Sequence, residues 1–182
     1  YITIDFQRTT NTLYGSFTLK RCKQEITFKR GRIITAGNTG HAILADICDS
    51  VIVQDSLIYC GGRDAYGFYV AAGYGNITNT KIYDATQAAI TSSGGSRVEV
   101  RDCDGNGNNR GLWVVGPSII NLPKNTTAPA GTANTFQSDG GQIWSVENLY
   151  TFPSAPKTET PPAPDTTYTW TATSAKSWRP QG

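Results

Sequence analysis

A short pattern of alternating apolar and polar residues recurs along the chain. The segments "ITIDF", "ITFKR", "VIVQD", "NITNT" and "VEVRD" each place apolar and polar side chains on opposite faces, as β-strands do. One apolar residue in each segment serves as its anchor, and the anchors are 24, 25, 24 and 23 positions apart: Ile4, Phe28, Val53, Ile77 and Val100. A nearly constant period of this length indicates a repeat architecture.

Two further sets of apolar residues follow almost the same period. The second set is spaced by 25 and 24 positions and contains Ile33, Ile58 and Ile82. The third is spaced by 25, 26, 20 and 24 positions and contains Leu19, Leu44, Val70, Ile90 and Val114. Turn segments such as "GRD", "SSGGS" and "DGNGNN" separate the three sets.

Three short strands per repeat predict an all-β fold, a right-handed parallel β-helix of about five to six coils, here called rungs. One rung cannot bury its inward side chains alone, whereas stacked rungs about 4.8 Å apart share a continuous core and pair their backbones. A β-sandwich with regularly spaced strands is the alternative. The repeated Asp or Asn two positions after an anchor favours the β-helix, because Asp55, Asn79 and Asp102 would then stack at one corner and bond to the turn backbone.

The later part of the chain predicts a change of organisation. We expect one more rung to start in "SIINLPK" (118–124), a loop in "NTTAPAGTANT" (125–135), and a final capping strand in "GQIWSVENLYTF" (141–152). The predicted β-helix therefore covers 1–152. Five prolines within 153–167 predict an extended linker, and 168–182 predicts the start of a C-terminal β domain or trimerisation segment. Because the chain begins at Tyr1 and contains no Met, we interpret it as a piece of a longer protein.

The composition of the chain argues against several classes of function and site. Sixteen basic and fourteen acidic residues give a formal charge of +2, which does not indicate nucleic-acid binding, and no apolar run has the length of a membrane span. Four cysteines without a CxxC pair and a single histidine predict no zinc site, and we expect no metal and no cofactor. The cysteines are expected to be free buried thiols, with a disulfide between neighbouring segments as the alternative.

Strand parity predicts a row of outward aromatic residues. If Ile58 and Ile82 point inward, their neighbours in sequence point outward and stack on one another, and the same parity applies beside Val70, Leu112 and Val114. The resulting candidates for carbohydrate binding are Tyr59, Tyr69, Tyr83 and Trp113, with Arg63 on an adjacent turn. Exposed aromatic residues on a solenoid can instead pack against a partner subunit, so both interpretations stay open.

Catalysis would require two carboxylates on either side of a glycosidic bond. Asp55 and Asp102 lie two rungs apart. Two strand spacings of about 4.8 Å put them about 9.6 Å from each other, which is at the edge of the range for inverting hydrolases. Asp64 and Asp84 lie on turns near the predicted tyrosines and are further candidates. Solvated turn carboxylates, with Arg63 as an ion-pair partner, are the alternative interpretation, and His41 is expected to be a turn histidine rather than a general base.

Rungs of about 24 residues, the Pro-rich connector and the closing "TYTWTATSAKSWRPQG" resemble bacteriophage tail-spike or tail-appendage proteins with a pectin-lyase-like β-helix. This resemblance implies a homotrimer that binds a host cell-surface polysaccharide, contacts other virion tail proteins, and is located extracellularly in the virion tail. Polysaccharide-degrading enzymes, either glycoside hydrolases or lyases, share the fold, so an enzyme is the alternative function. An inert spacer is a third possibility.

Overall fold

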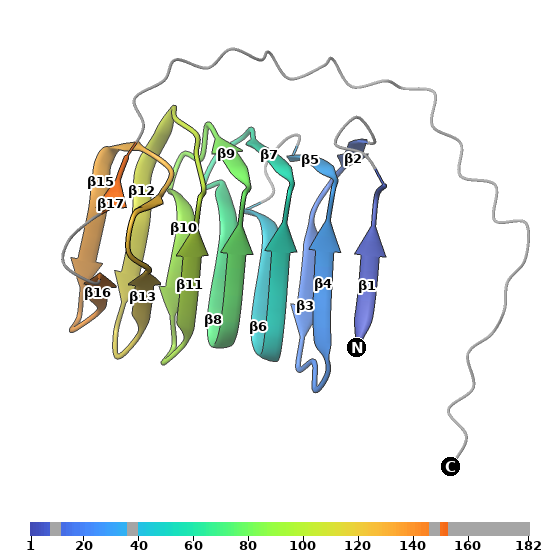
Figure 1. Cartoon of the computed structure of the whole chain (residues 1–182), viewed down its shortest axis with the longest axis horizontal. Coiled ribbons are helices and arrows are strands. Elements are labelled where there is room, and N and C mark those ends of the chain that lie inside the picture. Colours follow the sequence, from blue (N-terminus) through green and yellow to red (C-terminus); the bar gives the residue numbers. More distant parts are fainter. Residues whose placement is uncertain (8–11, 36–39, 146–149, 153–182) are drawn as a thin grey trace, which may run out of the picture.

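The protein is a stack of parallel β-strands. The computed structural model describes residues 1–7, 12–35, 40–145 and 150–152, and these form a parallel β-solenoid of about six turns (Figure 1). No described residue is helical, so none of them belongs to a helix that could cross a membrane. The linker predicted at 153–167 and the segment predicted at 168–182 lie outside the described residues.

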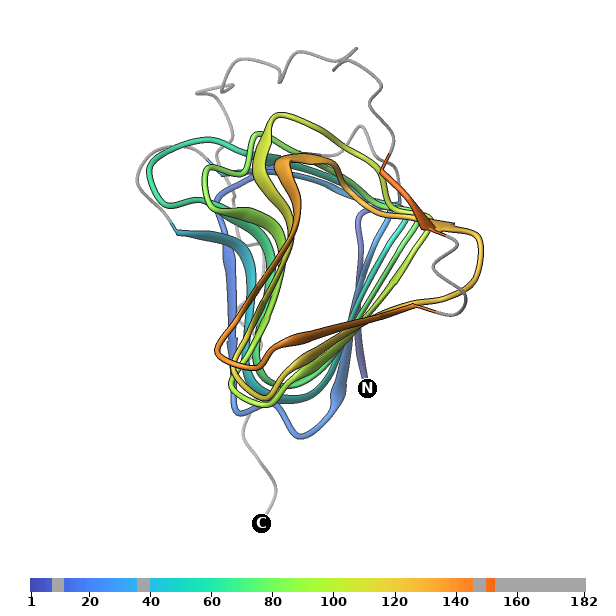
Figure 2. The same cartoon turned by 90° about the vertical axis from the view of Figure 1, so that its left-hand side faces the viewer.

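Three faces enclose the core, and their cross-section is roughly triangular (Figure 2). Face one contains β3 (Phe17–Lys20), the first halves of β6 (His41–Gln54) and β8 (Tyr66–Thr78), β10 (Ala88–Ser93), β12 (Asn108–Val115) and β15 (Gly131–Ser138). Face two contains β1 (Ile2–Asp5), β4 (Glu25–Lys29), the second halves of β6 and β8, β11 (Arg97–Arg101), β13 (Ile119–Leu122) and β16 (Gln142–Ser145). Face three contains β2 (Thr12–Tyr14), β5 (Arg32–Thr35), β7 (Leu57–Cys60), β9 (Lys81–Tyr83), β14 (Thr126–Thr127) and β17 (Tyr150–Thr151).

The observed register confirms two of the three predicted stacks. On face two the anchors lie directly opposite one another from rung to rung, in the order Ile4, Phe28, Val53, Ile77 and Val100. On face three the stack Ile33, Ile58 and Ile82 is also in register. All of these side chains except the partly buried Ile4 are buried, so the predicted period correctly identifies two walls of the core.

The third predicted stack is wrong at two positions. Val70 lies opposite Ala45 and Ser92, not opposite Leu44 and Ile90. Leu44 has the outward parity, whereas Ile90 points inward but lies two residues before Ser92 and opposite Phe68. Hydrophobicity alone therefore selected the wrong residue on both strands. The inward Ser92 is tolerated because its hydroxyl lies 2.7 Å from the Ser96 hydroxyl and donates to the Ile119 carbonyl oxygen at 3.2 Å.

The predicted Asp and Asn corner is confirmed. Asp55, Asn79 and Asp102 immediately follow successive strands of face two, with φ angles of 49°, 47° and 50°. Asp and Asn adopt this left-handed conformation more readily than most residues. The side-chain amide of Asn79 donates a hydrogen bond to Asp55 Oδ1 at 2.7 Å, so the repeated residue type turns the chain and also links two rungs.

The loop predicted for 125–135 is wrong, because this segment includes β14 and the start of β15. Thr126 pairs with Tyr150, while Gly131 pairs with Asn108. Small residues fill this rung: Ala128 is completely buried, and the side chain of Asn108 donates to the carbonyl oxygen of Ala130 at 2.8 Å. The solenoid therefore continues beyond the point at which the apolar pattern fades.

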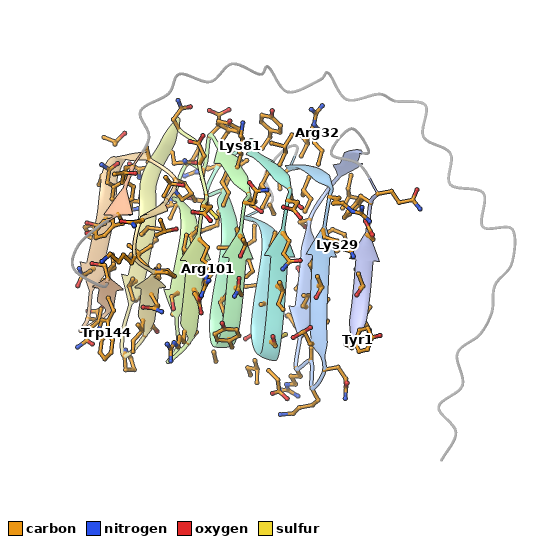
Figure 3. All side chains as sticks on the ribbon, viewed as in Figure 1. Tyr1, Lys29, Arg32, Lys81, Arg101 and Trp144 are labelled. Atoms are coloured by element: carbon orange, nitrogen blue, oxygen red, sulfur yellow. The ribbon has the colours of Figure 1, made fainter. Side chains whose placement is uncertain are left out.

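The two ends of the described stack carry exposed aromatic residues. Tyr1 lies beside the first rung and Trp144 on the last, at opposite ends of the solenoid (Figure 3). Trp144 is 58% exposed and projects from β16 on face two. It therefore lies on a different face from the aromatic residues of face one.

Candidate functional site

The outer surface of face one carries a row of residues in register across five strands. Inward residues on these strands, such as Phe68, Val70, Leu112 and Val114, are completely buried, so the residues between them point away from the core. The outward row at one level consists of Leu44, Tyr69, Thr91, Trp113 and Phe136. Three of its five members are aromatic.

Five rings on this surface form what we call the aromatic column: His41, Tyr66, Tyr69, Trp113 and Phe136. The His41 ring is stacked on Tyr66 with centroids 4.9 Å apart, and lies 5.0 Å from Tyr69. Tyr66 is stacked in turn on Trp113 at 6.0 Å, and Trp113 meets Phe136 edge to face at 6.1 Å. Ring contacts are therefore continuous from β6 to β15.

Tyr66 closes the gap in this column at β10, where Thr91 is a small residue between two aromatic positions. The Thr91 side chain is only 1% exposed, and its hydroxyl makes no hydrogen bond to any residue that the structure describes. It lies between Tyr69 and Trp113 in the strand register. A strand with a small outward residue thus lets the rings of β8 and β12 meet above it.

Arg110 adds a cation to the column. Its guanidinium lies 4.5 Å from the centroid of Trp113 and 4.7 Å from that of Phe136, close enough for cation–π attraction. Its Nη1 donates to the backbone carbonyl of Gln87 at 3.4 Å, and Gln87 Nε2 donates to Asp64 Oδ1 at 2.9 Å. A polar chain therefore runs along one border of the rings.

Burial favours the neutral forms of two rings in the column, His41 and Tyr66. Loss of solvent lowers the pKa of His41 below its ordinary value, and loss of solvent also raises the pKa of Tyr66. His41 is therefore an uncharged imidazole at neutral pH, and Tyr66 an uncharged phenol. The column therefore presents ring surface, and Arg110 is the cation beside it.

The structure divides the predicted carbohydrate-binding residues into two groups. Tyr69 and Trp113 point outward as predicted and belong to the aromatic column. Tyr59 and Tyr83 stack on each other as predicted, with centroids 5.3 Å apart, but they are not exposed. Only 2% of Tyr59 and 5% of Tyr83 is accessible, because both pack with Ile34 and Leu57 in a second apolar cluster outside face three. The prediction that these two tyrosines form an exposed platform is therefore wrong.

The four candidate aspartates occupy turns at two corners of the solenoid. Asp55 and Asp102 are exposed where face two turns into face three, one rung to either side of Asn79. Asp64 lies on the turn between β7 and β8, and its exposed carboxylate is 3.9 Å from Arg63, which confirms the predicted ion-pair partner. Asp84 follows β9 and is half-buried. Asp64 is linked to the aromatic column through Gln87.

Sequence reasoning missed His41, Tyr66, Arg110 and Phe136 as members of the site. A period of 25 residues relates His41 to Tyr66, which lie opposite each other in the register, so the repeat itself was a usable signal. Phe136 lay in the region where the period had faded, and no sequence pattern brings Arg110 to the two rings. Among the described residues, no group of three or more His, Cys, Asp or Glu side chains is arranged to hold a metal ion.

Comparison with known proteins identifies the architecture. Residues 2–142 match the sequence profile of a family described as "Right handed beta helix region". No curated protein and no solved structure shows significant similarity to the chain.

Proposed function

The chain belongs to the right-handed β-helix family, and we propose that it binds polysaccharide along the aromatic column of face one. The observation that carries this proposal is the continuous ring contact from His41 to Phe136. One face of a sugar ring presents mainly C–H groups, which gain free energy when an aromatic ring removes them from water. The fold is also consistent with polysaccharide binding or degradation.

The dimensions of the column support a polymeric ligand. It extends over the five strands from β6 to β15, and four inter-strand steps correspond to about 19 Å along the solenoid axis. A monosaccharide would cover only part of this length. Several consecutive sugar units can instead contact the rings together, with the exposed Phe136 at one end.

Arg110 and Asp64 provide polar recognition beside the rings. A guanidinium carries five donors, and the cation–π contacts of Arg110 with Trp113 and Phe136 occupy none of them, so donors remain for hydroxyl or carboxylate oxygens of a sugar. The exposed Asp64 carboxylate offers acceptors for sugar hydroxyl groups. The apolar rings would supply affinity, while these groups would orient the saccharide.

We further propose that this binding serves attachment of a bacteriophage tail spike or tail appendage to its host. The supporting observations are the resemblance of the repeat and the Pro-rich segment to such proteins, together with the parallel β-solenoid itself. In this proposal the protein is a homotrimer in the virion tail, contacts other tail proteins, and meets a host cell-surface glycan outside the cell. Tyr59 and Tyr83 have no part in the binding surface, because both are buried.

A polysaccharide-degrading enzyme is the second candidate. Its supporting observation is Asp64, a carboxylate connected to the column through Gln87 and Arg110. Hydrolysis by the common mechanism requires a second carboxylate about 5 to 9.5 Å away. Asp55 and Asp102 lie at another corner of the solenoid, so they do not complete such a pair with Asp64. Asp84 follows β9 on the next rung, at the same corner as Asp64, and is the remaining candidate for the second carboxylate. Binding without cleavage is the function that the aromatic column supports directly.

The two candidates are distinguished by incubating the protein with purified capsular polysaccharide, lipopolysaccharide O-chain and peptidoglycan. We expect the protein to bind one of these polymers without cleaving it, so that the bound polymer gains no new reducing ends and no absorbance at 235 nm. New reducing ends alone would establish hydrolysis, and absorbance at 235 nm would establish a lyase. Failure to retain any bacterial-envelope polymer would reject the proposed function and leave a spacer.

A further inference from the structure

Two of the four cysteines occupy equivalent positions on successive rungs near the start of the solenoid. Lys20 of β3 lies opposite Asp46 of β6, so the residues two positions further on, Cys22 and Cys48, are also matched. Backbone hydrogen bonds bracket them: Arg21 N donates to the Asp46 carbonyl oxygen at 2.8 Å, and Asp49 N donates to that of Cys22 at 2.9 Å. The pair is therefore held at the spacing of adjacent strands.

The two thiols also share their surroundings. Cys48 is 1% exposed and its Sγ lies 3.6 Å from the carbonyl oxygen of Leu19, on the strand that leads to Cys22. Cys22 is partly buried against the same core cluster, and its Sγ lies 3.7 Å from the Lys20 carbonyl oxygen. Burial raises the pKa of Cys22, and a hydrogen bond and the charge of the Cys48 thiol raise it further. Both sulfur atoms are thus directed into one small region.

We propose that Cys22 and Cys48 form a redox-responsive dithiol whose oxidation to a disulfide fastens two successive rungs at the N-terminal end of the solenoid. Adjacent strands lie about 4.8 Å apart, which falls within the Cα–Cα range of about 4.4 to 6.8 Å observed for disulfides. The bond needs little backbone movement, because the hydrogen bonds on either side already hold the two segments together.

The oxidant is a small-molecule disulfide such as oxidised glutathione. Cys22 is the more accessible thiol, so after losing its proton it attacks one sulfur of the oxidant and releases one glutathione thiolate. Cys48 then loses its proton and attacks Cys22 Sγ, which releases the second glutathione. The protein loses two electrons and two protons, and one oxidised glutathione becomes two reduced molecules.

The other two cysteines are not equivalent to this pair. Cys60 ends β7 on face three, and Cys103 follows β11 at the corner with face three; both are completely or almost completely buried. Burial raises the pKa of Cys103 to about 12, and burial also raises the pKa of Cys60 strongly. Both thiols are also inaccessible to solvent, unlike the partly exposed Cys22, and they therefore react more slowly than Cys22 in the folded protein. They serve as internal references for the reactivity of Cys22 and Cys48.

A rung at the end of a solenoid has a neighbour on one side only, so end rungs open more readily than central ones. A bond between Cys22 and Cys48 closes a covalent loop of about 26 residues, which restricts the unfolded chain. Oxidation should therefore stabilise the N-terminal end, and reduction should release it. The effect is a reversible change in local stability and involves no contact with the aromatic column.

The test uses the whole chain treated with oxidised glutathione between pH 7 and 9. After free thiols are alkylated, cleavage before aspartate places the four cysteines in separate peptides, 5–45, 46–48, 55–63 and 102–103. We expect loss of two thiols, a link between peptides 5–45 and 46–48, and faster oxidation as the pH rises. The melting temperature should increase by roughly 5–10 °C and return to its starting value after reduction.

Two variants and one control make the result decisive. Cys22→Ser and Cys48→Ala should each abolish the linked peptide and the thermal shift, whereas Cys103→Ala should retain both. A link involving Cys60 or Cys103, or a glutathione adduct that persists on Cys22, would overturn the proposal. Four remaining thiols after treatment at pH 9 would overturn it as well.

Discussion

The rings of Tyr66 and Trp113 are stacked at an interplanar angle of 14° with centroids 6.0 Å apart, although β10 lies between their strands. This contact exists because β10 presents the small, buried Thr91 at the level of the rings. It joins the ring contacts of β6 and β8 to those of β12 and β15. The proposed binding surface therefore depends on Tyr66 as its central connection.

Tyr66→Ala should divide the aromatic column and weaken polysaccharide binding by about tenfold, since an aromatic contact contributes about 0.5–1.5 kcal/mol beyond its buried area. Tyr66→Phe keeps the ring and should retain the affinity of the unmodified protein. Affinity electrophoresis in gels containing the bound polymer measures both. Equal migration of Tyr66→Ala and Tyr66→Phe in such gels would refute the central role of this ring.

Asn79 should stabilise the corner in two separable ways. Asn79→Ala removes the bond to Asp55 and places alanine at a φ of 47°, so we expect a loss of about 2 kcal/mol in unfolding free energy. Asn79→Gly also loses the bond but accepts the backbone conformation, so its loss should be smaller, about 1 kcal/mol. Urea denaturation of both variants measures the difference. Equal stability of Ala and Gly at this position would show that the conformation contributes nothing.

Asn108 should be a major determinant of stability in the region where the apolar pattern fades. Its buried amide donates to the carbonyl oxygens of Ile82 at 3.1 Å and Ala130 at 2.8 Å, and accepts from Ala85 N at 2.9 Å. Asn108→Ala leaves these buried groups without a partner and should cost about 3 kcal/mol. The adjacent, exposed Asn109 is the control, and Asn109→Ala should change stability by less than about 0.5 kcal/mol. Similar urea midpoints for the two variants would contradict this assignment.

The pH dependence of stability should include a contribution from His41. Burial lowers the pKa of His41 in the folded protein below its ordinary value of 6.5, so the unfolded chain binds a proton more readily. This contribution is fully present above about pH 6.5 and is lost as the pH falls through the lower folded-state pKa. His41→Phe removes the proton-binding group but keeps a ring, so its melting temperature should fall less than that of the unmodified protein between pH 7.5 and 5. Parallel melting profiles would exclude the effect.

The sequence predicted the fold well where each inward position was filled by one residue type. Ile, Val and Phe recur at the anchors of faces two and three, and a repeated Asp or Asn marks their common corner. Face one was harder to predict because Ala45 and Ser92 occupy inward positions while Leu44 points outward. The strands within 125–135 were mistaken for a loop for a related reason, since small residues such as Ala128 and the amide of Asn108 replace large apolar side chains there.

The candidate site was predictable in part. Strand parity correctly directs Tyr69 and Trp113 outward, but parity does not show whether an outward residue is exposed. Tyr59 and Tyr83 have the correct parity and are nevertheless buried in a second apolar cluster. The position of Arg110 above two rings depends on side-chain conformations, which the repeat period does not encode.

The most direct test of the account compares two tryptophans that lie on different faces of one solenoid. Trp113 belongs to the aromatic column, whereas Trp144 is 58% exposed on face two. Titration calorimetry with the retained polysaccharide should show at least tenfold weaker binding for Trp113→Ala and unchanged binding for Trp144→Ala, with both variants folded by circular dichroism. Unchanged affinity for Trp113→Ala, or an equal loss for Trp144→Ala, would contradict the assignment of polysaccharide binding to face one.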